Sequence, residues 1–225
     1  MATPEAPRDC RSCPRLAAFR DAQAAREPTW FNGAVPSFGD PDGRLAVVGL
    51  APGLRGANRT GRPFTGDYAG DLLYATLTRH GFASGRFEAR PDDGLRLVDC
   101  LVTNAVRCVP PENKPTGAEI AACRPFLGAR LAAMPNLAAV VTLGRIAHDS
   151  ALRALGARPK DAPFGHGAVA AVGGVTVFAS YHCSRYNTNT GRLTAAMFDA
   201  VFAAARAHLD GARGATSPTR AGVGG

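Results

Sequence analysis

Short apolar runs alternate with amphipathic stretches along most of this chain. Four of the runs are rich in Val, Leu and Ala and have the length of buried β-strands. Each is followed by a stretch with apolar residues at helical spacing, which is typical of strands joined by crossover helices. We therefore expect an α/β fold, a three-layer α/β/α arrangement around a central four-stranded parallel sheet. The strands are expected at residues 45–50, 96–103, 138–143 and 175–180.

Several predicted helices have recognisable ends. Pro14 fits the first turn of a helix, and Thr116 with Glu119 forms a capping box. Asp67 can cap a helix for which Gly81 provides the stop. The helices are expected at residues 14–26, 67–80, 117–134 and 144–155 and from residue 194 onwards, with a candidate hairpin strand at 168–172.

The chain has the length of one domain with a sizeable core. We expect a single domain over residues 10–209, a disordered N-terminus at 1–9 and a flexible tail at 210–225, where the residues are small and polar. No apolar run reaches membrane-spanning length, and the start of the chain lacks the apolar core of a secretory signal. A cytoplasmic protein that does not bind membranes is therefore expected.

Basic residues outnumber acidic ones, 26 Lys and Arg against 18 Asp and Glu, for a net charge of +8. This excess favours a polyanionic partner such as nucleic acid, although a basic background composition is an alternative. One loop, residues 51–66, combines glycines with arginines that suit an anionic ligand, and an ordinary solvated loop is again the alternative. Its arginines are Arg55, Arg59 and Arg62.

Polar residues follow the ends of the predicted strands. The loop of residues 51–66, Asn104, Gly144 and His182 each come directly after an apolar run. Because ligands of open α/β sheets bind at the carboxyl ends of the strands, we expect one shared site at this edge.

The six cysteines argue against a disulfide framework, because the chain is long and has no signal peptide. Four thiolates can hold zinc or an iron–sulfur cluster, and spacing alone does not choose between them. These four are Cys10 and Cys13, a C-x-x-C pair that could alternatively be a redox pair, and Cys108 and Cys123. Cys100 is expected in the core, and Cys183 is disfavoured as a nucleophile because nothing activates it.

Four separated motifs resemble those of the type 5 (b-class) uracil-DNA glycosylases. They are V-P-S-F-G-D-P at 35–41, G-L-A-P-G through F-T-G-D at 49–67, N-A-V-R-C-V-P-P-E-N-K-P at 104–115 and H-C-S-R-Y-N-T-N-T-G-R-L-T at 182–194. The resemblance covers about residues 10–208. It implies removal of uracil from double-stranded or single-stranded DNA at the start of base excision repair, by a monomer. It also implies a [4Fe–4S] cluster on Cys10, Cys13, Cys108 and Cys123, and action on other deaminated bases such as hypoxanthine.

The resemblance assigns roles that the chemistry of base excision supports. A glycosylase flips its target nucleotide and breaks a bond whose leaving base becomes an anion, so charge stabilisation is the main demand. His182 is expected to donate to a uracil oxygen, Asn104 to pair with the base edge, and Phe64 to stack on it. A structural histidine and a phenylalanine that anchors the loop are the alternatives.

Water activation is assigned to Asn58, which matches a position that is acidic in other family members. An amide orients water but accepts no proton, and Asp67, the nearest carboxylate of this loop, already has a role as a helix cap. Tyr186 occupies the position of the wedge that fills the gap left by the flipped base, where other members often carry Gln. The substrate contacts are expected at Ala51, Gly53, Phe64, Asp67, Ser184, Arg185 and Tyr186.

Two other functions compete with this prediction. One is a uracil-DNA glycosylase of type 4, and the other is a non-catalytic iron–sulfur protein that binds DNA and senses damage. A nucleotide-phosphate binder would need a P-loop lysine, which the loop lacks. Lys114 is the only lysine near the motifs, so a monofunctional hydrolase of N-glycosyl bonds, without lyase chemistry, is expected.

Overall fold

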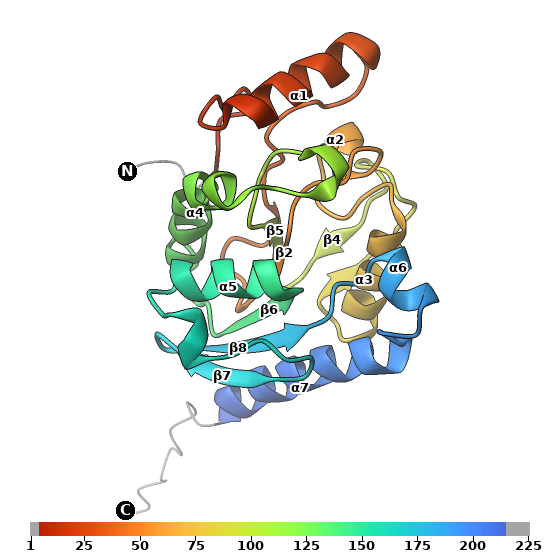
Figure 1. The fold of residues 1–225 in the computed structure, drawn as a ribbon. Helices are drawn as coiled ribbons and strands as arrows, with labels where there is room; N and C mark the ends of the chain where they lie inside the picture. The colour runs from red at the N-terminus through yellow and green to blue at the C-terminus, as the bar shows by residue number, and fades with distance from the viewer. Residues whose placement is uncertain (1–4, 215–225) are drawn as a thin grey trace, which may run out of the picture.

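The computed structural model describes residues 5–214. Its centre is a six-stranded sheet with the order β1-β5-β2-β6-β8-β7 (Figure 1). The four inner strands run parallel, and β1 and β7 add one antiparallel strand at each edge. The predicted parallel sheet and the candidate hairpin strand are thus confirmed. The strands are β1 (Phe38–Gly39), β2 (Leu45–Gly49), β5 (Cys100–Asn104), β6 (Ala139–Leu143), β7 (Val169–Val172) and β8 (Val175–Ser180).

The strand predicted at residues 96–103 is divided in two. Its first part, β4 (Arg96–Leu97), pairs with β3 (Ala83–Ser84) in a separate small sheet, and β5 begins at Cys100. Asp99 lies between them with a φ of 56°, in the left-handed region, and its carboxylate accepts hydrogen bonds from the backbone and side chain of Arg44. A left-handed residue cannot continue a strand, which explains the break.

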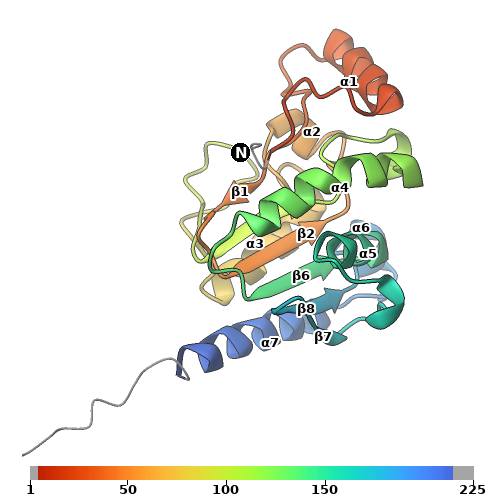
Figure 2. The same ribbon diagram turned by 90° about the vertical axis from the view of Figure 1, so that its left-hand side faces the viewer.

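Helices cover both faces of the sheet (Figures 1 and 2). Leu73 of α3 and Phe198 of α7 belong to the core on one face, while Leu127 of α4 and Ala151 of α5 belong to the core on the other. This is the three-layer arrangement expected from the sequence. The helices are α1 (Pro14–Arg26), α2 (Ala57–Thr60), α3 (Tyr68–Arg79), α4 (Gly117–Ala132), α5 (Arg145–Ala154), α6 (Arg185–Asn189) and α7 (Ala195–Gly214), with short 3₁₀ turns η1 (Pro111–Asn113) and η2 (Pro159–Asp161).

The predicted helix ends are mostly accurate. Thr116 and Glu119 form the expected capping box, because each side chain bonds the backbone amide of the other. Two short helices, α2 and α6, were not predicted. A single turn contains too few residues for its apolar positions to show a period.

The two ends of the described chain differ from expectation. Residues 5–9 were predicted to be disordered, yet Glu5 bonds Arg107 at 3.0 Å and Arg130 at 2.8 Å. The buried guanidinium of Arg107 needs a counter-charge, and Glu5 supplies it. Helix α7 extends to Gly214, beyond the predicted boundary at residue 209. The rest of both predicted tails lies outside the described residues.

No helix within residues 5–214 combines the length and the apolar character that a membrane span requires. The single-domain boundaries and the cytoplasmic location stay predictions.

Candidate active site

A cavity of about 570 Å³ lies at the carboxyl ends of β2, β5 and β8. It is the site expected at this edge, and it brings together eight of the ten residues predicted for catalysis and substrate binding. Asn58 and Tyr186 are the two that do not line it. The lining residues are Leu50, Ala51, Pro52, Gly53, Ala57, Phe64, Gly66, Asp67, Tyr68, Ala69, Asn104, Asn113, His182, Ser184 and Arg185.

His182 lies two residues beyond the end of β8, between this cavity and a smaller hollow beside it. Its ring stacks on Phe64, with 6.0 Å between the ring centroids and 28° between the planes. Although the ring keeps partial contact with solvent, the surrounding protein lowers the pKa of His182 to about 4. The imidazole is therefore neutral at pH 7 and can donate one N–H into the cavity.

Asn104 ends β5 and pairs in register with Gly49 of β2. Its Oδ1 is buried and has no hydrogen-bond partner among the described residues. A buried acceptor left unpaired costs about 1–3 kcal/mol, so a ligand that donates a hydrogen bond here would relieve the cost.

Gly49 makes room for two groups of the site at once. A Cβ at this position would lie 2.5 Å from Oδ1 of Asn104 and 2.5 Å from Cζ of Phe64. Both contacts are closer than real Cβ atoms tolerate. The side-chain amide of Asn104 and the ring of Phe64 can therefore occupy their positions only because residue 49 has no side chain.

The loop that carries Phe64 has an unusual backbone conformation. Phe64 has a φ of 52°, which is rare for a bulky residue and requires support from its surroundings. The neighbouring Pro63 provides some of it, because its carbonyl accepts a hydrogen bond of 2.6 Å from the hydroxyl of Tyr74. Gly70 also allows a close approach, since a Cβ there would lie 1.9 Å from the Phe64 carbonyl oxygen.

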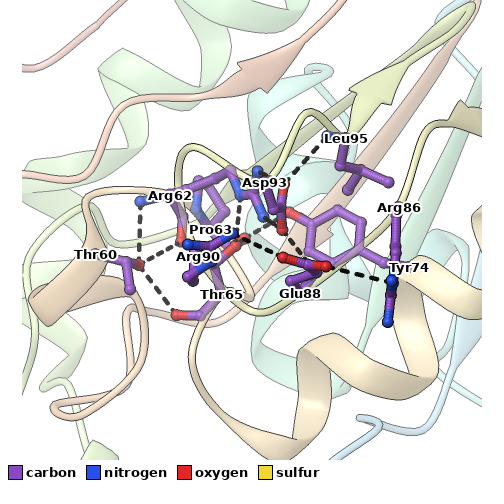
Figure 3. A network of polar contacts seen from close by, with 10 residues as sticks. All are labelled: Thr60, Arg62, Pro63, Thr65, Tyr74, Arg86, Glu88, Arg90, Asp93 and Leu95. Atoms are coloured by element: carbon purple, nitrogen blue, oxygen red, sulfur yellow. Dashed lines mark hydrogen bonds and ion pairs between the residues drawn. The ribbon is translucent and has the colours of Figure 1, made fainter.

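Arg62 holds the same loop through a buried ion pair (Figure 3). Its guanidinium donates to both carboxylate oxygens of Asp93, at 2.8 and 2.7 Å, and its Nε donates to Thr65. The pair lies against aromatic rings, and the guanidinium holds the pKa of Asp93 well below its usual range. The rings are those of Phe38, Tyr74 and Phe87, with centroids 5.0, 5.7 and 5.6 Å from the guanidinium carbon. The prediction that Arg62 serves an anionic ligand is therefore wrong, because its donors are already paired inside the protein.

Asp67 occupies the N-cap position of α3 and lines the cavity. Burial raises its pKa, although the nearby amides of Gly70 and Ala69 act in the opposite direction. Its Oδ1 is buried without a partner in the described structure. Gly53 and Gly56 leave space for the other oxygen, since a Cβ at either would fall within 2.7 Å of it. No capping hydrogen bond of regular geometry forms, and the amides of the first helical turn act on the carboxylate from nearby.

Asn58 lies behind the cavity wall rather than in the cavity. Its side chain is fully buried and donates to Oδ1 of Asn32 at 2.9 Å. The amide therefore holds the turn around Asn32 against α2, and a role of Asn58 in positioning water stays a prediction.

The segment after His182 forms α6 at the cavity mouth. Ser184 caps this helix by accepting a hydrogen bond from the amide of Asn187, and Arg185 lies over the ring of Tyr68 at 5.3 Å. Tyr186 is 72% exposed and is not among the residues that line the cavity, so its role as a wedge stays a prediction.

Sequence reasoning missed Asn113, which lines the cavity from the end of η1 with a φ of 58°. Its position inside the quoted motif at residues 104–115, directly after two prolines and a glutamate, was the available signal. Tyr68 also lines the cavity, at the first position of α3.

The four cysteines expected to bind metal line one small cavity between α1, α4 and the segment after β5. The Cys108 sulfur accepts a hydrogen bond from Arg20 at 3.1 Å, and the Cys123 sulfur accepts one from the Arg107 amide at 3.3 Å. Burial raises the pKa of Cys123 to about 11. No three His, Cys, Asp or Glu side chains within residues 5–214 converge closely enough to hold a single metal ion. In a cluster with several irons, each cysteine binds a different iron, so the four sulfurs need not converge on one point. Four cysteines around one cavity are a donor set that fits such a cluster.

The other two cysteines are buried away from that cavity. Cys100 belongs to the core on the α3–α7 face of the sheet, as expected. Cys183 is fully buried, its thiol donates to the Ala69 carbonyl, and burial raises its pKa. These features are the opposite of what a nucleophilic thiol needs.

A cavity at the strand ends, with a neutral histidine, an unpaired amide and a stacked aromatic ring, is suited to holding a planar heterocycle. The Uracil DNA glycosylase superfamily matches the chain over residues 36–206. The type-5 uracil-DNA glycosylase of Thermus thermophilus is 48% identical over 196 residues, which is 84% of this chain and 89% of that protein. Those of Mycobacterium bovis and Pyrobaculum aerophilum are 44% and 42% identical, over 88% and 83% of this chain and 77% and 83% of the respective relatives.

Two levels of classification follow from these matches. The chain belongs to the uracil-DNA glycosylase superfamily. Within it, the chain belongs to the type-5 uracil-DNA glycosylase family, which decides against the type 4 alternative.

Proposed function

We propose that this protein hydrolyses the N-glycosidic bond of uracil in DNA, leaves an abasic site and thereby initiates base excision repair. The observation that carries the proposal is the cavity in which His182 and the unpaired Oδ1 of Asn104 lie beside the Phe64 ring. Membership of the type-5 family supports the same reaction. The substrate would be double-stranded or single-stranded DNA, bound by a monomer.

The residues act on the leaving base as its negative charge develops. The neutral imidazole of His182 donates a hydrogen bond to a uracil oxygen, where it stabilises the anion more than the intact nucleotide. Asn104 accepts the N–H of the base edge with its unpaired Oδ1. The ring of Phe64 stacks on the base and keeps water away from that face.

We infer that Asp67, rather than Asn58, positions the attacking water. Asp67 lines the cavity and has an unpaired carboxylate oxygen, whereas Asn58 is fully buried behind the wall. A carboxylate can also accept the proton of that water, which an amide cannot. The low exposure of Asp67 favours proton acceptance, because burial raises its pKa.

We propose that deaminated bases other than uracil also enter the site. A cavity of about 570 Å³ is within the range that holds whole small molecules, so a purine such as hypoxanthine has room. The residues that line it include Ala51, Gly53 and Ala69, which are small and leave space for a second ring. A panel of oligonucleotides that contain uracil, hypoxanthine, xanthine or ethenocytosine would rank these substrates.

We also propose that Cys10, Cys13, Cys108 and Cys123 hold a [4Fe–4S] cluster. The four side chains share one cavity, and two of the sulfurs accept hydrogen bonds that favour thiolate ligands. When bound, the cluster would supply a cross-link between the N-terminal segment and the sheet. Zinc is the alternative, and the colour and iron content of the protein distinguish the two metals.

One assay decides between catalysis and the non-catalytic alternative of an iron–sulfur protein that senses DNA damage. Under single-turnover conditions, the protein should convert a uracil-containing duplex to an alkali-sensitive product, and leave the matched thymine duplex intact. His182→Ala should bind the same duplex with near-normal affinity. Its rate should fall by about 10²–10³, because a preorganised donor is removed. Binding without any cleavage by the wild-type protein would favour the sensor.

A further inference from the structure

A second hollow, of about 500 Å³, lies on the far side of α2 from the active-site cavity. Four segments that are distant in sequence form it: the N-terminal segment before α1, the turn after α1, helix α2 and the loop that leads to β4. Three of its lining side chains are arginines and none is acidic. The lining residues are Arg8, Thr29, Trp30, Phe31, Arg59, Thr60, Ala89, Arg90 and Pro91. This set is called the aromatic–arginine hollow below.

Two basic residues of the hollow hold Phe31 in place. Arg8 lies over the ring of Phe31 at 4.5 Å and donates to the Phe31 carbonyl at 2.7 Å. The Phe31 amide donates to the carbonyl of Arg59, which ties the turn to α2. Gly61 leaves room for the Phe31 ring, since a Cβ there would lie 2.7 Å from it. The neighbouring Trp30 remains partly exposed.

The arginines present positive charge to solvent. Arg59 is exposed and takes part in none of the ion pairs within residues 5–214. Arg90 is also exposed and bonds Glu88 at 2.7 Å, but Glu88 lies outside the lining of the hollow. Guanidinium groups beside an aromatic face are the combination with which proteins hold unpaired nucleic-acid strands.

The hollow is connected with the active-site cavity through α2. Ala57 lines the cavity and Arg59 and Thr60 line the hollow, within one helical turn that rises about 1.5 Å per residue. The guanidinium of Arg59 also lies against Gly66 of the cavity, where a Cβ would be 2.8 Å from Nη2. One DNA strand carries a phosphate about every 3.4 Å of helix axis, so the two sites are separated by very few nucleotides.

We propose that the aromatic–arginine hollow binds the unpaired DNA strand that flanks the target nucleotide. Arg59 and Arg90 hold its phosphates, and the exposed face of Trp30 stacks on one of its bases. This inference rests on the proposed function, since it takes the strand in the active-site cavity as its reference. The contact with Trp30 favours DNA whose segment beside the target nucleotide is single-stranded, because only an unpaired base can reach the indole.

Trp30 is the only tryptophan of the chain, so its fluorescence reports directly on the hollow. Titration of the full chain with a short, uracil-free oligothymidylate should quench the emission saturably, with the same midpoint as the anisotropy of a labelled strand. Trp30→Ala should weaken this binding about tenfold, as expected for the loss of one base–aromatic stack. Trp30→Phe should restore most of the affinity.

The arginines are tested by salt dependence. Arg59→Ala and Arg90→Ala should each reduce the slope of log affinity against log salt by about one unit. Arg153→Ala is the matched control, because Arg153 is an exposed arginine of α5 outside both hollows. If the Trp30 variants fold poorly, the exposed Arg90 still tests the proposal.

Failure of this proposal can be told from failure of the proposed function. Unchanged Trp30 emission at saturating oligothymidylate, together with unchanged slopes in both arginine variants, would overturn the hollow as a DNA site. Excision from a single 2′-deoxyuridine 5′-phosphate nucleotide, which has no flanking base or phosphate to reach the hollow, tests the function alone. Trp30→Ala and Arg90→Ala should process that nucleotide at the wild-type rate.

Discussion

At the scale of single residues, the site depends on groups whose chemistry is changed by burial. His182 is neutral because the protein around it disfavours the imidazolium, and Asp67 has a raised pKa for the corresponding reason. The sequence motifs predicted His182, Asn104 and Phe64 at one site. They could not predict that Asn58 faces inward, because the direction of a side chain on a single helical turn has no signal in the sequence.

The pH dependence of excision tests the state of His182. A pKa lowered to about 4 keeps the ring neutral from about pH 5 upwards, so the single-turnover rate should show no inflection near 6.5, the ordinary histidine value. Protonation of His182 should affect the rate only near pH 4, whereas Asp67, whose pKa is raised by burial, gives an inflection of its own. An inflection that disappears in Asp67→Asn belongs to that carboxylate. An inflection near 6.5 that persists in Asp67→Asn would contradict a neutral His182.

Gly49→Ala tests whether the missing side chain at residue 49 sets the site geometry. The new methyl group would collide with Asn104 and Phe64, and such overpacking costs about 1–3 kcal/mol. The variant should fold, bind undamaged DNA as the wild type does, and excise uracil at least tenfold more slowly. Gly117→Ala is the control, since a Cβ there meets no atom within 4 Å. Equal excision rates in both variants would show that the Phe64 ring and the Asn104 amide move aside for the new methyl group without loss of function.

At the scale of elements, the long periodic segments were predictable and the loops were not. The strands β2, β6 and β8 and the capping box of α4 agree with the apolar pattern, because each signal is local. The break at Asp99 depends on an ion pair with Arg44, 55 residues away in sequence. Arg62 was misread for a similar reason: its partner Asp93 comes from a distant loop. Pairings over such separations cannot be derived from one sequence.

Asp93→Asn tests the support of the Phe64 loop. The side chains of Asp93 and Arg62 are 0% and 5% exposed, so removing one charge leaves the other buried and unpaired. We expect a loss of about 3–5 kcal/mol in the free energy of unfolding, measured with denaturant. Asp161→Asn, which breaks an exposed pair with Arg158, should leave the free energy of unfolding almost unchanged.

The pH dependence of the Arg62–Asp93 pair has a definite sign. Because the folded pKa of Asp93 is lowered, the pair stabilises fully above the unfolded value of about 4, and the contribution is lost as the pH falls further. The difference in stability between wild type and Asp93→Asn should therefore be constant near neutral pH and shrink in acid. A difference that grows as the pH falls would contradict the assignment.

At the scale of the whole molecule, the proposed cluster would join parts of the chain that the sheet does not connect. Cys10 and Cys13 precede α1, whereas Cys108 follows β5 and Cys123 lies in α4. A cluster bound to Cys13 and Cys108 would close a loop of 108 − 13 = 95 residues. By the chain-entropy estimate for cross-links, a closure of this length is worth about 4–5 kcal/mol. The N-terminal segment and α1 should therefore depend on the metal more than the sheet does.

Metal content and stability test this dependence together. Protein purified anaerobically without added metal should be brown and contain about four iron and four sulfide per chain, as the cubane requires. Cys10→Ala should lower both the iron content and the melting temperature, because one ligand is lost. Cys100→Ser changes a buried cysteine outside that cavity, so it should leave the iron content unchanged even if the core is weakened.

Because the active-site cavity uses none of the four cysteines, Cys10→Ala should retain uracil excision at temperatures where it stays folded. Zinc without iron in the wild-type protein would refute the cluster and leave the proposed excision chemistry untouched.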